Sequence, residues 1–142
     1  MADKSTPRPV FRNIHVTDII SYRLPPAGIV SILHRVSGAV LFLLLPLIVW
    51  FFDTSITSES SYEQFTAAFS AGIGFVPGVL LKVVVWGLIW AYLQHFIAGI
   101  RHLWMDATHS VTKEDGHLSA ISTLAASLLL TLALGAKLFG LF

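Results

Sequence analysis

The sequence has no cysteine and little charge. Of its 142 residues, 12% are Asp, Glu, Lys or Arg, and the formal net charge is +1. A chain without cysteine forms no disulfide, holds no cysteine-ligated iron–sulfur cluster and builds no zinc ribbon. Any redox role therefore requires another cofactor, for which the six histidines are the candidate ligands. The net charge itself says little about partners, and we expect no nucleic acid among them.

Apolar side chains, in contrast, are abundant. They make up 55% of the chain, and the mean hydropathy is +0.76, above the range of ordinary soluble domains. A transmembrane helix needs roughly 20 mostly apolar residues, and three segments meet this requirement, at about 28–52, 79–104 and 118–141. We therefore expect an all-α integral membrane protein with three transmembrane helices, a single anchor domain over 1–142. Residues 1–27 are expected to form a cytoplasmic tail, and their scattered charges and prolines argue against a cleaved signal peptide.

Local signals mark the helix boundaries. The prolines of RLPPAG place the start of the first span near Ala27. Between the first two spans, Ser60 and Glu63 have capping-box spacing and precede aromatic residues on one side, which predicts a short interfacial helix ended by GFVPG. The connection from Asp106 to His117 contains the turn signal KEDG, and its shortness predicts that spans two and three are antiparallel neighbours.

Lysine and arginine are distributed unevenly over the two sides of the predicted bundle. Seven of the nine lie in the N-terminal tail, at the head of span one or around the second connection: Lys4, Arg8, Arg12, Arg23, Arg35, Arg101 and Lys113. Only Lys82 and Lys137 lie on the other side. The positive-inside rule then places the N-terminus in the cytoplasm, or in the matrix, and the C-terminus outside. We expect a multi-pass protein of the bacterial inner membrane with a periplasmic C-terminus.

Polar and ionisable residues gather at the inner end of the first two spans. Ser31, His34 and Arg35 fall in the first turns of span one, and His95 and His102 in the last turns of span two. A titratable group below the headgroups costs a few kcal/mol on insertion scales, so it usually faces a cavity, a partner or a cofactor. The pattern therefore predicts one functional cluster in the inner leaflet.

Other polar residues of the spans have simpler explanations. Lys82 is expected to snorkel to the headgroups, and snorkelling stays open for Arg35 and Arg101. A stripe at four-residue intervals in span three predicts a helix-packing face without chemistry: Ser119, Thr123, Ser127, Thr131 and Gly135. Three histidines in flanking segments are expected to be solvated or to cap helices: His15, His109 and His117.

His95 is the most informative position. Counted from Val79, it lies about 24 Å into its helix, where a neutral imidazole still needs partners for both nitrogens. Small residues share its face: Ala91, Ala98 and Gly99. Small side chains on either side of a histidine clear the flat area that a porphyrin requires if the histidine binds its iron. The alternative is that these residues form a close-packed helix interface, across which His95 donates a hydrogen bond.

A single helix cannot supply both axial ligands of one iron from His95 and His102, because seven residues separate them by roughly 10 Å along the axis. Only His34 lies at similar depth within the chain, so another subunit is the expected donor of the second ligand. His102 is better placed to meet a haem propionate or water at the interface, with Asp106 one turn on to orient it.

Two motifs in this order and spacing carry a family resemblance. SILHRVSG, at 31–38, and HFIAGIRHLWMD, at 95–106, resemble the signatures of the cytochrome b subunits of succinate dehydrogenase, the larger membrane anchors of respiratory complex II. The similarity extends from Arg8 and Pro9 to the C-terminus. The tail departs from the mitochondrial type, because RPVFRNIH stands where a Ser-Pro-His stretch follows RP, which puts its contacts with soluble subunits in doubt.

The resemblance implies a role for each motif residue. His95 matches the axial ligand of haem b, His34 and Arg35 lie where the haem propionates are expected, and His102 is a residue near the haem. Ser31 and Arg35 match residues that contact ubiquinone or another quinone. Because they share a helix face, Ser31 is expected to donate to a quinone carbonyl, while Arg35 stabilises negative charge developing on the quinone and a propionate.

The resemblance also implies partners. We expect a multi-subunit helical bundle in which a second three-helix anchor supplies the other axial histidine, with soluble iron–sulfur and flavoprotein subunits on the inner side. The chain alone should have no activity and should serve succinate:ubiquinone oxidoreduction as an electron-transfer and quinone-binding subunit in the lipid bilayer. Two alternatives stay open: a haem-free structural anchor, and the anchor of a fumarate reductase working in the opposite direction. A transporter is less well supported, since three spans without an inverted repeat form no obvious pathway.

Overall fold

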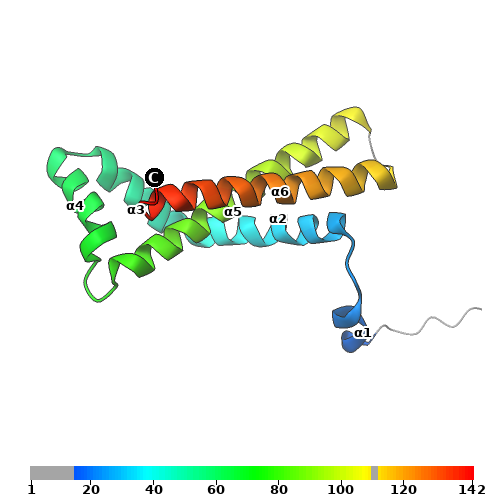
Figure 1. The fold of residues 1–142 in the computed structure, drawn as a ribbon, viewed down its shortest axis with the longest axis horizontal. Coiled ribbons are helices and arrows are strands. Elements are labelled where there is room, and N and C mark those ends of the chain that lie inside the picture. Colours follow the sequence, from blue (N-terminus) through cyan, green and yellow to red (C-terminus); the bar gives the residue numbers. More distant parts are fainter. Residues whose placement is uncertain (1–14, 110–111) are drawn as a thin grey trace, which may run out of the picture.

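The computed structural model of the chain describes residues 15–109 and 112–142, and within these ranges its regular structure is helical (Figure 1). The helices are α1 (Val16–Ser21), α2 (Pro26–Leu43), α3 (Leu45–Ile56), α4 (Glu59–Ala71), α5 (Gly78–Thr108) and α6 (Lys113–Leu138). A single isolated β-bridge joins Ile73 and Val76 in the described part, in the turn between α4 and α5. The all-α architecture is confirmed.

Three of the helices, α2, α5 and α6, are long and apolar enough to cross a membrane, which confirms the three spans. They lie side by side, and each packs against the other two (Figure 1). The start of α2, the end of α5 and the start of α6 share one end of this bundle, whereas α3, α4 and the C-terminus lie at the other (Figure 1). Basic residues at the first end include Arg23, Arg101 and Lys113. The grouping expected from the sequence therefore holds for the described residues, which exclude Lys4, Arg8 and Arg12.

The first span is shorter than expected. We predicted one helix over 28–52, but α2 ends at Leu43, and Leu44 breaks the helix with φ −95° and ψ 7°. Pro46 stands in the first turn of α3. Proline has no N–H to donate to the preceding turn, and its ring collides with the carbonyl four residues earlier. The remaining apolar residues, Leu45–Ile56, therefore form a separate short helix.

The short helix expected between the first two spans is α4, and its cap differs from the predicted one. Ser58 rather than Ser60 is the N-cap. The Ser58 hydroxyl accepts a hydrogen bond from the Ser61 N–H, and the Ser61 hydroxyl accepts one from the Ser58 N–H. Glu63 takes no part in the box. After Ala71, Gly72 leaves the helix with φ 91°, a conformation that favours glycine.

The two long spans both extend farther than expected at the end of the bundle where α2 begins. We predicted 79–104 and 118–141, but α5 extends to Thr108 and α6 begins at Lys113. KEDG is therefore the first turn of α6 and not a turn between helices. The Thr112 hydroxyl accepts from the Asp115 N–H, and Glu114 and Asp115 place negative charge at the positive end of the helix dipole. The antiparallel pairing of α5 and α6 is as predicted.

The interior of the bundle is built from small side chains. Val30, Ala98 and Ala120, one from each spanning helix, are fully buried against one another. The stripe on α6 packs inward as predicted, and its buried members are Thr123, Ser127, Thr131 and Gly135. Small residues let the three backbones approach closely, which is how helices associate in a medium without a hydrophobic effect.

Candidate functional site

Three histidines from α2 and α5 meet toward the end of the bundle where α2 begins and α5 ends. The rings of His34 and His95 stack with their centroids 4.2 Å apart and their planes at 19°. The His102 ring centroid lies 5.2 Å from that of His34. Because α2 and α5 run in opposite directions, the first turns of one helix lie beside the last turns of the other (Figure 1). The sequence placed His34 at the depth of His95, and the ring contact agrees with that placement.

The surroundings of His95 determine which ring nitrogen carries the proton. Its Nδ1 lies 3.0 Å from the backbone carbonyl oxygen of His34 and 3.5 Å from Ser37 Oγ, while that hydroxyl donates to the same carbonyl at 3.0 Å. A carbonyl oxygen can only accept, so Nδ1 carries a proton. Nε2 makes no hydrogen bond within the described part of the chain, so this nitrogen is the one left to bind a metal. A histidine that donates Nδ1–H to a carbonyl is the usual form of a metal ligand.

Gly38 makes room for this ring on α2. A Cβ at Gly38 would lie 2.8 Å from His95 Cε1 and 3.1 Å from Nδ1. Ordinary carbon contacts are about 3.5–4.0 Å, so any larger residue would push the imidazole out of position. The sequence analysis did not assign Gly38 a role, although it is the last residue of the SILHRVSG motif.

The small residues around His95 mostly serve helix packing. Ala91 and Ala98 are fully buried inside the bundle, and Ala98 contacts Val30 and Ala120. They leave no flat surface open beside the ring, so for these two residues the packing alternative is the correct one. Gly99 is half-buried and borders the cluster, since a Cβ there would lie 3.8 Å from His34 Nε2.

Ser31 and Arg35 lie on α2 on either side of His34. The Ser31 side chain is half-buried, and that of Arg35 is exposed. Neither makes a side-chain hydrogen bond or ion pair within residues 15–109 and 112–142. Both polar groups are therefore available to a molecule that approaches α2 from outside the chain.

Arg101 does not snorkel. Its side chain is 7% exposed; Nε donates to Ser119 Oγ at 2.9 Å and Nη2 donates to the Gly116 carbonyl at 3.2 Å. It therefore ties the end of α5 to the start of α6. The expected pairing of Asp106 with His102 is not among the contacts of the described residues; instead, the Asp106 carbonyl lies 2.8 Å from Nδ1 of His109.

Gln94, the residue before His95, has a role that the sequence analysis missed. Its side chain is fully buried, and Oε1 accepts a hydrogen bond of 2.7 Å from Ser127 Oγ on α6. Its Nε2 is buried without a partner among the described residues. The available signal was the spacing of Trp86, Gln94 and Arg101, which places all three toward one side of α5.

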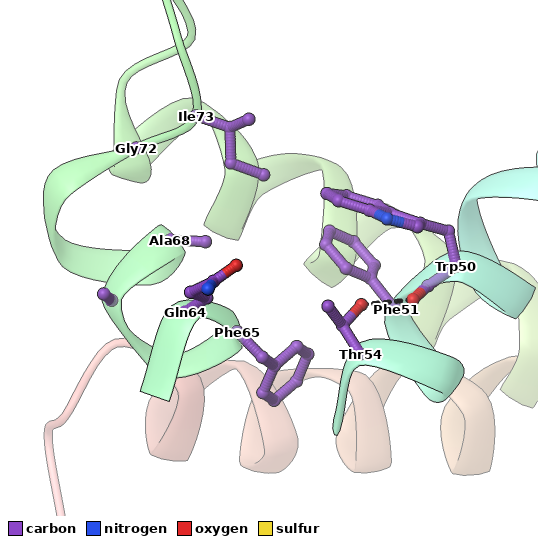
Figure 2. A pocket seen from close by; sticks show the side chains of 9 residues that line it. Trp50, Phe51, Thr54, Gln64, Phe65, Ala68, Gly72 and Ile73 are labelled. Carbon is purple, nitrogen blue, oxygen red and sulfur yellow. Dashed lines mark hydrogen bonds between the residues drawn. The ribbon is translucent and has the colours of Figure 1, made fainter. Parts of the chain in front are cut away.

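Two cavities lie away from the cluster of His34, His95 and His102. One, of about 750 Å³, opens at the end of the bundle where α2 begins, among Pro25, Arg101, Met105, Lys113 and His117. Another, of about 290 Å³, lies between α3 and α4 at the opposite end, lined by side chains that include Trp50, Phe65 and Ile73 (Figure 2). None of the predicted site residues lines either cavity.

The donor set suits a cofactor that brings most of its own ligands. Within the described ranges, no group of three or more His, Asp or Glu side chains is arranged around a common metal position. A haem iron already has four porphyrin nitrogens and would need only one or two further ligands from protein side chains, commonly histidine. His95, with a fixed tautomer and a half-buried ring, fits the need for one such ligand.

Comparison with known proteins gives a consistent result. The family described as succinate dehydrogenase/fumarate reductase transmembrane subunit matches residues 7–134. The succinate dehydrogenase cytochrome b556 subunit of Coxiella burnetii is 35% identical over 111 residues, which is 78% of this chain and 83% of the relative. The protein of the same name from Paracoccus denitrificans is 32% identical over 109 residues, 77% of this chain and 78% of the relative. The cytochrome b560 subunit of Reclinomonas americana is 29% identical over 111 residues, covering 78% and 76%.

Proposed function

The chain belongs to the succinate dehydrogenase/fumarate reductase transmembrane subunit family, and from that membership we propose that it is a haem-bearing, quinone-binding anchor of a succinate:quinone oxidoreductase. It is a multi-pass membrane subunit of this enzyme family. Its relatives are named as cytochromes of the b type, which supports haem b as the cofactor here.

The observation that carries the proposal is the state of the His95 ring. A neutral imidazole whose Nδ1–H is held by the His34 carbonyl at 3.0 Å presents its lone pair on Nε2. Hydrogen bonding at the far nitrogen orients the ring and raises its basicity as a ligand. His95 is therefore the proposed axial ligand, and the bound haem would supply a site for one-electron transfer.

The other residues of the cluster would hold the periphery of the cofactor. His34 stacks on His95, His102 borders His34, and Arg35 lies one residue along α2. An exposed guanidinium pairs well with carboxylates because its fork of donors matches their geometry. We assign His34 and Arg35 to the haem propionates and His102 to the margin of the site.

Ser31 and Arg35 are the proposed quinone contacts. The Ser31 hydroxyl would donate to a carbonyl of the quinone head group, and the permanent charge of Arg35 would stabilise negative charge on the quinone as it accepts electrons. Their position at the inner end of α2 suits electrons arriving from an iron–sulfur subunit docked there. The proposed assembly also contains a flavoprotein subunit and a second anchor in the inner membrane, with the N-terminus of this chain in the cytoplasm.

A reduced-minus-oxidised spectrum of the purified complex tests the cofactor. The wild-type complex should show a b-type band, His95→Ala should lose it, and His117→Ala should keep it, because His117 is an exposed residue of α6. A normal band in an assembled His95→Ala complex would refute the assignment. A wild-type complex without any band would favour the haem-free structural anchor.

Quinone reduction is tested separately with Arg35→Ala. Removing a charged hydrogen-bond donor costs about 1.5–3 kcal/mol, so succinate:quinone reductase activity should fall roughly 10- to 100-fold. Succinate oxidation with an artificial acceptor should not change. Arg23→Ala, which removes an exposed arginine outside the motif, is the control. Unaltered quinone reduction in the Arg35→Ala complex would remove this role.

A further inference from the structure

Two successive residues of α5 form hydrogen bonds to two different helices. The Nδ1–H of His95 donates to the His34 carbonyl on α2, while Oε1 of Gln94 accepts from Ser127 Oγ on α6. Neighbouring residues of a helix lie about 100° apart around its axis. The two bonds therefore hold α5 from two directions at the level of His95.

We propose that Gln94 is a positioning residue that sets the rotation of α5 and thereby aims His95 Nε2 at its ligand position. This inference rests on the proposed role of His95 as a haem ligand. A rotation of α5 by about 10° displaces an atom at its outer radius of about 5–6 Å by roughly 1 Å. Functional groups need placement within about 0.5 Å, so even a small rotation matters.

Two further contacts join α5 to α6 on the same side. Trp86 Nε1 donates to the Thr131 carbonyl at 3.0 Å, and Arg101 bonds Ser119 and Gly116. Along the helix axis, Trp86 lies about 13.5 Å from His95 and Arg101 about 9 Å from it. Gln94 is the member of this set adjacent to His95, and its bond is therefore the one that fixes rotation at the ligand.

The way Gln94 is buried indicates that it orients α5 and does not stabilise the bundle. Its Nε2 is enclosed without a partner among the described residues, and an unpaired buried donor is unfavourable. An apolar side chain of the same length would remove that penalty. It would also leave no new unpaired group, because the Ser127 hydroxyl still bonds the Leu124 carbonyl at 3.1 Å.

The test uses the assembled complex with the Gln94→Met substitution. We expect haem content and thermal stability equal to or above those of wild type, together with shifted haem electron paramagnetic resonance g-values and a shifted midpoint potential. Ser127→Val should reproduce the shifted g-values and midpoint potential. Ser127→Thr has the shape of the valine variant but retains the hydroxyl, so it should keep the wild-type spectrum.

The outcomes separate this inference from the proposed function. A wild-type complex without haem contradicts both. Wild-type haem with an unshifted signature in Gln94→Met overturns the positioning role alone. Failure of Gln94→Met to assemble, or lower thermal stability with unchanged g-values, would make Gln94 a structural residue and would also overturn it.

Discussion

The substitution Gly38→Ala probes the contact between α2 and the His95 ring directly. The added methyl would lie 2.8 Å from His95 Cε1, whereas carbon contacts are about 3.5–4.0 Å. The ring must therefore retreat by roughly 0.7 Å. It cannot do so freely, because one face stacks on His34 and Nδ1 is bonded at 3.0 Å. Overpacking of this kind costs about 1–3 kcal/mol.

Replacing glycine by alanine in a helix also gains about 1 kcal/mol in helix propensity. The two effects partly cancel in Gly38→Ala, so its stability must be compared with that of a matched glycine-to-alanine variant. Gly28→Ala provides it, since Gly28 lies in the same helix and its Cβ would meet atoms at 3.6 Å or more, an ordinary distance. We expect Gly38→Ala to be less stable than Gly28→Ala by about 1–3 kcal/mol in thermal unfolding of the complex. Its b-type band should be weakened or shifted, whereas Gly28→Ala keeps the wild-type band. Equal stability of the two variants together with an unaltered band would refute the reasoning.

Three further substitutions test the packing. Gly135→Ala would drive a methyl into the Trp86 indole, whereas the methyl of Gly87→Ala would meet no atom within 4 Å beyond its own turn of helix. Because both substitutions gain helix propensity, Gly135→Ala should be less stable than Gly87→Ala by about 1–3 kcal/mol; equal thermal midpoints would contradict this packing. Arg101→Met removes the bonds to α6 and should also cost about 1–3 kcal/mol; an unchanged thermal midpoint would show that these bonds do not stabilise the bundle. Ser58→Ala removes the N-cap of α4 and should cost about 1 kcal/mol; it should speed amide hydrogen exchange in α4 alone, and unaltered exchange there would exclude the cap.

The sequence predicted the spans because their signal is averaged over many residues. Helix α6, for example, is mostly apolar and has no Asp, Glu, Lys or Arg between Asp115 and Lys137. Its stripe of small residues identified its buried face before any neighbour was known. The similar depth of His34 and His95 could also be predicted, since the positions of both along their helices follow from counting residues. Such predictions need only the length and direction of each helix.

The break at Leu44 was missed, although its cause is visible in the sequence. Apolar composition continues unchanged from α2 into α3, so hydropathy alone cannot divide them. Pro46 is the local signal, and its effect on the preceding turn outweighs the average of the run. The early start of α6 was missed for a similar reason, because the capping geometry of Thr112 decides the boundary and KEDG is compatible with either a turn or a first helical turn.

Spacing places Gln94 on the same side of α5 as Trp86 and Arg101, but neither spacing nor composition predicts which residue it bonds. Whether a polar residue of a span faces lipid, a cavity or another helix depends on the rotation of that helix, which is set by its contacts along both neighbours. The partner of Gln94 was in the predicted packing stripe of α6, but the register that brings Ser127 to its level emerges only when α5 and α6 are packed together. The same register hides Ala91 and Ala98, which the sequence left open as a surface for a porphyrin.

The stacking of His34 on His95 bears on where the second axial ligand of the proposed haem must come from. The lone pair of an imidazole nitrogen lies in the plane of its ring, and two axial ligands of one iron point at each other from opposite sides of the porphyrin. Rings that stack at 4.2 Å with planes 19° apart direct their lone pairs along nearly parallel planes, not toward a common point between them. His102, roughly 10 Å farther along the same helix as His95, cannot oppose it either. The cluster of His34, His95 and His102 would therefore offer one axial ligand, and a haem with two histidine ligands would take the second from elsewhere, which we propose is a partner subunit; a low-spin, six-coordinate spectrum from this chain reconstituted with haem in the absence of partners would contradict that reasoning.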